Sequence, residues 1–123
     1  MFLLCAVCLL AILNTMKTVL VVFTGTGNTL KVARDLAAAL PEETEIIRLS
    51  HRSFPEEIRA DKVIILYPVY CFGLPAMVHG WLGLVRFPDN PLVYGVATYG
   101  GLLCAAGRML KKRIQTRGFR FSG

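Results

Sequence analysis

The chain has 123 residues, of which 54% are hydrophobic, and its 14 basic and 8 acidic side chains give a formal net charge of +6. This length fits one domain of ordinary size, and the hydrophobic fraction excludes a disordered chain. Eleven glycines without a strict period exclude a collagen-like protein, and four cysteines are too few for a disulfide-dense scaffold. We therefore expect a single folded domain.

The first 13 residues are all apolar, but a membrane-spanning helix needs roughly 20 such residues. No basic residue precedes Lys17 and no small-x-small cleavage site is present, so the run does not match a secretory signal. Cys5 and Cys8 form a C-x-x-C inside this run, a context that suits neither zinc nor a thioredoxin-type pair. We divide the chain into an apolar extension, 1–15, and a domain, 16–123. An upstream start site, a signal or anchor, and a buried segment are the explanations for the extension. We expect a cytoplasmic protein without a membrane partner.

Four segments have the composition of strands. Residues 18–23, 62–67 and 91–97 are nearly continuous apolar runs, which is typical of strands buried on both faces of a parallel sheet. Residues 44–49 are less apolar and indicate an edge strand. Helical spacing of apolar residues lies between these runs, over 30–40, 74–85 and 102–114.

The ends of these helices carry recognisable signals. Pro41 ends the first, Pro75 suits the first turn of the second, and Gly118 suits the position just after the third. The resulting order is β-α-β-β-α-β-α with a short crossover at residues 50–61. Strands that alternate with helices predict an α/β fold with a doubly wound parallel sheet.

Ligands of open α/β sheets bind at the carboxyl ends of the strands, so the loops there are the candidate site. The first loop, residues 24–29 (TGTGNT), has two glycines that allow a tight turn and four polar side chains. A helix begins directly after it, and a helix start favours an anion. The loop lacks the Gly-Lys-Ser/Thr of a Walker motif, and Leu30 replaces the third glycine of a dinucleotide fingerprint. We therefore predict an uncharged phosphate-binding loop.

The loops after the third and fourth strands, residues 68–73 (PVYCFG) and 98–101 (TYGG), each contain a tyrosine beside small residues. An aromatic ring there suits contact with a planar ligand. His51 and His79 lie in a polar crossover and a helical pattern, and we interpret both as structural or solvated. We interpret Cys71 and Cys104 as packing residues. No arrangement of catalytic side chains and no metal site is predicted.

These three motifs, in this order, resemble the flavodoxin-like family over about residues 16–120, most closely the flavodoxin domain that is often fused to a ferredoxin-type domain in anaerobic bacteria. The resemblance implies a sheet of order 2-1-3-4-5 and non-covalent FMN as cofactor. It implies that the first loop holds the phosphate, that the other two flank the isoalloxazine ring, and that Tyr99 stacks on it. The implied cofactor-binding residues are Thr24, Gly25, Thr26, Gly27, Asn28, Thr29, Pro68, Val69, Tyr70, Cys71, Phe72, Gly73, Thr98, Tyr99, Gly100 and Gly101.

The chain departs from this family in three ways. It has no ferredoxin cysteine motif, it is basic where flavodoxins tend to be acidic, and it stops where a fifth strand would only be starting. We therefore expect the fifth strand and the last helix to be largely missing. The expected function is electron transfer through FMN with a redox partner such as a ferredoxin or a reductase. An FMN-dependent NAD(P)H:quinone oxidoreductase, and a flavin-free interaction module or gene remnant, are the alternatives.

The basic excess lies in one late segment. Residues 1–90 hold eight basic and eight acidic side chains, and no acidic residue follows Asp89. A nucleic-acid surface is one interpretation of such a run. A solvated helix face and helix end, where cations suit the helix dipole, is the other, and we favour it and expect no nucleic-acid partner. The six basic residues are Arg108, Lys111, Lys112, Arg113, Arg117 and Arg120.

Overall fold

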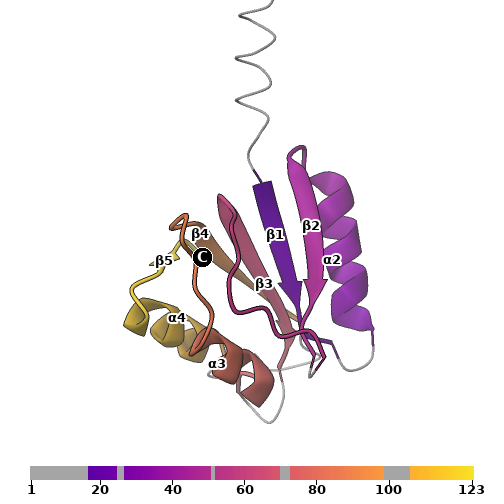
Figure 1. Ribbon diagram of the computed structural model, residues 1–123. Helices are drawn as coiled ribbons and strands as arrows, with labels where there is room; N and C mark the ends of the chain where they lie inside the picture. The colour runs from indigo at the N-terminus through magenta and orange to yellow at the C-terminus, as the bar shows by residue number, and fades with distance from the viewer. Residues whose placement is uncertain (1–16, 25–26, 51, 70–72, 99–105) are drawn as a thin grey trace, which may run out of the picture.

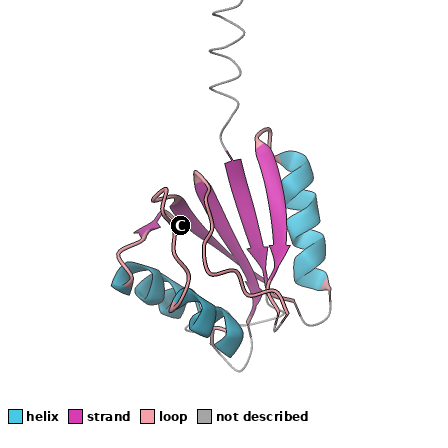
Figure 2. Ribbon diagram, viewed as in Figure 1, coloured by secondary structure: helices cyan, strands magenta, loops and turns pink. Residues whose placement is uncertain are grey.

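The computed structural model describes residues 17–24, 27–50, 52–69, 73–98 and 106–123. Its strands form one parallel sheet in the order β2-β1-β3-β4-β5, which confirms the predicted fold class (Figures 1 and 2). The extension 1–15 lies outside the described residues. The elements are β1 (Lys17–Val22), α2 (Asn28–Ala39), β2 (Glu43–Arg48), β3 (Lys62–Pro68), α3 (Ala76–Leu82), β4 (Leu92–Thr98), α4 (Ala106–Thr116) and β5 (Arg120–Phe121).

The central strands β1 and β3 are buried on both faces because helices cover both sides of the sheet (Figure 1). Leu20 pairs in register with Ile46 on β2 and with Ile64 on β3. The edge strand β2 alternates between exposed and half-buried residues over most of its length, as its weaker apolar pattern predicts. Continuous apolar runs therefore mark the middle of the sheet.

Among the described elements, α2 is the helix that covers one face of the sheet. Leu20, Val22, Ile64 and Leu66 point to this face and pack with Ala33 of the helix. The helix ends at Ala39, and Leu40 has an extended ψ of 135°. Pro41 explains this ending, because a proline disfavours helical geometry in the residue before it.

The other face is covered by α3, α4 and the crossover between β2 and β3 (Figure 1). The crossover contains no helix in its described part, residues 52–61, yet it buries Ile58 and Ala60 in this core. The indole N–H of Trp81 donates to the carbonyl oxygen of Pro55 at 2.8 Å. The amide of Ile58 donates to the carbonyl of Arg86 at 3.0 Å. The crossover is thus fixed by bonds to α3 and to the segment after it.

The second helix is shorter than its apolar pattern predicts. The pattern covers residues 74–85, but α3 runs only from Ala76 to Leu82. Pro75 precedes the helix in an extended conformation, and Gly83 is its C-cap. Val85 still packs in the core, because its amide bonds to the carbonyl of Trp81 at 2.9 Å in a further turn. The helical spacing of apolar residues therefore extends past the end of α3, and the predicted helix was too long.

The last helix ends as its sequence predicts. Gly118 follows α4 with a φ of +76°, which favours glycine. Its amide donates to the carbonyl of Gln115, and the amide of Phe119 donates to that of Ile114. These two bonds are a Schellman motif, which satisfies carbonyls at the end of a helix.

The fifth strand is two residues long. Arg120 pairs with Leu92 and Phe121 with Val93, and the amide of Gly95 donates to the carbonyl of Gly123 at 2.8 Å. The described residues therefore contain a short strand beside β4, at the place of the fifth strand in the predicted order. Gly95 also lets α4 pack closely on the sheet, because a Cβ atom there would collide with the side chain of Leu110.

Candidate functional site at the carboxyl edge of the sheet

The carboxyl ends of β1, β3 and β4 lie side by side at one edge of the sheet (Figure 2). Hydrogen bonds continue just past the strand ends. The amide of Phe23 donates to the carbonyl of Leu66 at 2.9 Å, and the amide of Val69 donates to that of Thr98 at 3.0 Å. The segments that leave the three strands therefore start from fixed positions.

A glycine caps the start of α2, and this cap makes no side-chain hydrogen bond to the helix. Gly27 is the N-cap and has a φ of +93°, a conformation that costs other residues about 1–2 kcal/mol. Its amide donates to the hydroxyl of Thr24 at 2.9 Å, and its carbonyl accepts from the amide of Lys31 at 3.0 Å. A glycine cap offers no side chain to the first amides of the helix, so these amides are suited to an external acceptor.

A pair of threonines connects this turn to the end of β4. The hydroxyl oxygens of Thr29 and Thr98 lie 2.9 Å apart, and either can be the donor. Thr29 is only 2% exposed. Because the hydroxyl of Thr29 is buried and already bonded to Thr98, the group of Thr29 that is suited to a phosphate is its backbone amide. Sequence reasoning listed both threonines but missed the bond between them.

The electrostatics of the turn suit an anion. The first turn of α2 contains no acidic side chain, and the positive end of the helix dipole lies there. The hydrogen-bonded carboxylate of Glu42 instead follows α2, before the first residue of β2, where it bonds Lys62 at 3.1 Å. No carboxylate of the first turn therefore opposes a phosphate at the start of α2.

The loop after β3 approaches α4. A Cβ atom placed on Gly73 would lie 3.1 Å from the sulfur of Met109.

The predicted site residues lie in two described places. The turn from β1 into α2 contains Thr24, Gly27, Asn28 and Thr29, and the end of β3 places Pro68 and Val69 next to Thr98. The remaining predicted site residues are outside the described part of the chain: Gly25, Thr26, Tyr70, Cys71, Phe72, Tyr99, Gly100 and Gly101.

No group of three His, Cys, Asp or Glu side chains within the described residues is placed to hold a metal ion. His79 lies on α3, where its carbonyl accepts a bond from Arg113. Among the helices of the described ranges, none is long and apolar enough to cross a membrane.

Known structures share this architecture. A flavoprotein from Lactobacillus acidophilus, solved in complex with FMN, superposes with a TM-score of 0.67 at 18% identity, over 89% of this chain and 91% of that one. A flavodoxin from the domain Archaea has a TM-score of 0.67 at 13% identity, over 87% of this chain and 78% of that one. The rubredoxin oxygen:oxidoreductase of Desulfovibrio gigas has a TM-score of 0.68 at 19% identity, over 89% of this chain but only 30% of that one.

The fold is therefore flavodoxin-like, and the matched structures include a flavoprotein and a flavodoxin at 18% and 13% identity. No family model matches the sequence. No curated protein matches it either. The likeness to known structures thus rests on architecture.

Proposed function

We propose that this chain binds FMN non-covalently at the carboxyl edge of β1, β3 and β4 and serves as an electron carrier. The observation that supports this most is the glycine-capped start of α2. Gly27 adopts a positive φ there, its cap makes no side-chain hydrogen bond, and the helix dipole favours an anion. This turn has no carboxylate in its first helical residues, so it suits a negatively charged phosphate better than a carboxylate-lined turn would. The solved neighbour with FMN has the same fold.

The residues of this chain have separate roles in the proposal. The backbone amides at the start of α2 bind the phosphate, and Thr24 holds the turn through its bond with Gly27. The bonded pair of Thr29 and Thr98 keeps the phosphate turn and the end of β4 at a fixed separation. The segments that contain Tyr70 and Tyr99 flank the ring, with Tyr99 as the stacking residue. FMN, when bound, supplies the one- and two-electron chemistry, and the protein supplies orientation and the exclusion of water.

Two glycines give a matched test. Gly27→Ala adds a methyl group in open space but at a φ of +93°, whereas Gly80→Ala adds one in open space within α3. We expect Gly27→Ala to weaken FMN binding by about tenfold, because it disturbs the amides that face the phosphate and costs about 1–2 kcal/mol. Gly80→Ala should leave binding unchanged. Quenching of flavin fluorescence during titration measures both.

Riboflavin separates phosphate binding from ring binding because it lacks the phosphate. The Gly27→Ala variant should bind riboflavin as well as the native chain does. Equal losses for FMN and riboflavin would contradict the phosphate assignment. If the native chain quenches neither ligand, the flavin proposal is wrong. Bleaching of the bound flavin by NADPH alone would show an oxidoreductase instead of a carrier.

A further inference from the structure

The six late basic residues divide into two groups with different surroundings. Arg117 donates to the carbonyls of Leu82 and Val85 at 2.8 and 2.9 Å, and Arg113 donates to that of His79 at 3.3 Å. These arginines fasten α4 to the end of α3. Arg120 bonds the carbonyl of Asn90 at 3.3 Å. Half of the basic run is therefore structural.

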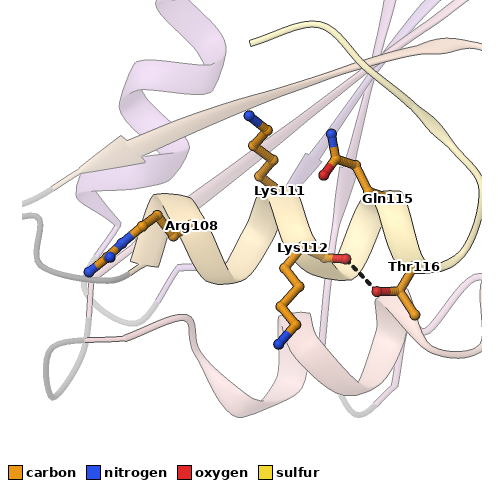
Figure 3. Close-up of a pocket in the computed structure, with 5 residues that line it drawn as sticks. All are labelled: Arg108, Lys111, Lys112, Gln115 and Thr116. Atoms are coloured by element: carbon orange, nitrogen blue, oxygen red, sulfur yellow. Dashed lines mark hydrogen bonds between the residues drawn. The ribbon is translucent and has the colours of Figure 1, made fainter.

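The other half forms an exposed stripe on α4. Arg108, Lys111 and Lys112 are exposed, and Figure 3 shows their side chains extending away from the helix. None of the ion pairs found among the described residues includes α4. No acidic residue follows Asp89 in the sequence, and α3 contains none. The three charges of the stripe are therefore available to a partner.

The surface around the stripe has two features of a docking surface, namely shallow hollows and an exposed methionine. Lys112 and Thr116 belong to two open hollows, one on the outer side of α4 and one between α4 and α3. Met109 lies at the second hollow and is 38% exposed. Methionine and arginine are enriched at protein interfaces, and a flexible thioether adapts to a partner surface. We call Arg108, Met109, Lys111, Lys112, Gln115 and Thr116 the basic face.

The basic face lies next to the candidate site. Met109 lies close to Gly73, which follows β3: a Cβ atom placed on Gly73 would be 3.1 Å from the sulfur of Met109. Arg108 lies in the first described turn of α4, the helix that follows β4 along the chain. A partner that covers the basic face would therefore be close to the loops proposed to hold the flavin.

We propose that the basic face docks an acidic redox protein, an inference that rests on the proposed function. The charge is complementary to such a partner, and its position would bring the partner's redox centre near the flavin. A nucleic acid fits less well, because the stripe has only three cations, within five residues or about 7–8 Å of helix. Tight binding of a duplex commonly uses 6–10 phosphate contacts.

Two double variants with equal net charge test the proposal. Lys111→Glu/Lys112→Glu and the control Arg34→Glu/Arg48→Glu each lower the formal charge by four, from +6 to +2. Arg34 and Arg48 are exposed on α2 and β2. Binding of an acidic bacterial ferredoxin is measured by calorimetry at 50 mM and 500 mM NaCl, with and without FMN. We expect the α4 variant to bind at least about tenfold more weakly at 50 mM.

The control variant should lose much less, and the difference should shrink at 500 mM because salt screens exposed charges. Equal losses in both variants would show a net-charge effect and overturn the proposal, as would no loss in either. Tighter binding of a 20-base-pair duplex or of vesicles with 30% phosphatidylglycerol than of the ferredoxin would overturn it as well. If the glutamate pair lowers the melting temperature, Lys111→Gln/Lys112→Gln should still weaken ferredoxin binding more than Arg34→Gln/Arg48→Gln does. FMN titration of the same variants reports separately on the proposed function.

Discussion

The two faces of the sheet are stabilised in different ways. On the α2 face, one regular helix packs on the sheet. On the opposite face, two helices and a crossover without a helix share one core. Side chains there donate to carbonyls: Trp81 to Pro55, and Arg117 to Leu82 and Val85. Irregular backbone needs such donors because a buried carbonyl without a partner is costly.

The two faces of the sheet therefore differ in the groups that they present to a ligand or partner. The helix on the α2 face starts at a glycine cap that makes no side-chain hydrogen bond, whereas on the α3–α4 face the side chains of Trp81 and Arg117 donate to backbone carbonyls. The basic run itself is divided, because Arg113 and Arg117 donate to carbonyls of His79, Leu82 and Val85, whereas Lys111 and Lys112 are exposed.

The largest expected effect is at Trp81, which is fully buried on the α3–α4 face. Trp81→Ala should lower the free energy of unfolding by about 3–5 kcal/mol. Trp81→Phe keeps most of the apolar volume but leaves the carbonyl of Pro55 without its donor, and should cost about 1–3 kcal/mol. Urea denaturation followed by circular dichroism measures both.

Amide exchange sharpens this prediction. The amide of Ile58, which bonds Arg86, should exchange faster in Trp81→Phe, whereas amides of β1 should change only with global stability. A loss below about 0.5 kcal/mol in Trp81→Phe would show that the indole bond does not hold the crossover.

The second effect concerns the division of the basic run. Arg117→Met keeps an apolar stem but removes the donor to two carbonyls, so we expect a loss of about 1–3 kcal/mol in unfolding free energy. Lys111→Met removes an exposed charge on the same helix and should stay within about 0.5 kcal/mol of the native chain. Chemical denaturation of the two variants is the measurement. Equal effects would contradict the distinction between structural and free cations.

The third effect is at the junction of the candidate site. Thr29→Val and Thr98→Val should each destabilise the chain, because each leaves the other hydroxyl without its partner in a mostly buried place. The double variant should lose less than the sum, with a coupling of about 0.5–1.5 kcal/mol. A double-mutant cycle on unfolding free energies measures this coupling. Additive losses would mean that the two hydroxyls act independently.

The sequence was sufficient for the elements whose signals are local. Continuous apolar runs located β1, β3 and β4, and Gly118 located the end of α4. The strand order followed from the resemblance, and the pairing confirms it. The extent of α3 did not follow, because apolar spacing continues to Val85 through a turn that only the core contacts make visible.

Contacts between distant residues were beyond the sequence. The bond between Thr29 and Thr98 joins positions 69 apart and depends on the register of β1, β3 and β4. The use of Arg117 as a donor to α3 likewise depends on how two helices pack. A run of positive charge in the sequence does not reveal which cations are bonded to carbonyls.

The smallest expected effect concerns the amino edge of the sheet, where the carboxylate of Glu42 bonds residues at the starts of β1 and β3. Glu42 accepts bonds from the ammonium group of Lys62 at 3.1 Å and from the hydroxyl of Thr18 at 3.0 Å. The bond to Lys62, followed by the bond to Thr18, holds the pKa of Glu42 below its ordinary value of 4.5. Because the folded-state pKa is the lower one, the carboxylate stabilises the fold above pH 4.5 and this contribution is lost as the pH falls through the lowered pKa. The pair is partly exposed, so the contribution should be below about 1 kcal/mol. Glu42→Gln should therefore unfold slightly more easily than the native chain at pH 7, and the difference should shrink towards zero in urea titrations at progressively lower pH. A constant difference across that range would show that the loss comes from packing and not from the charge of Glu42.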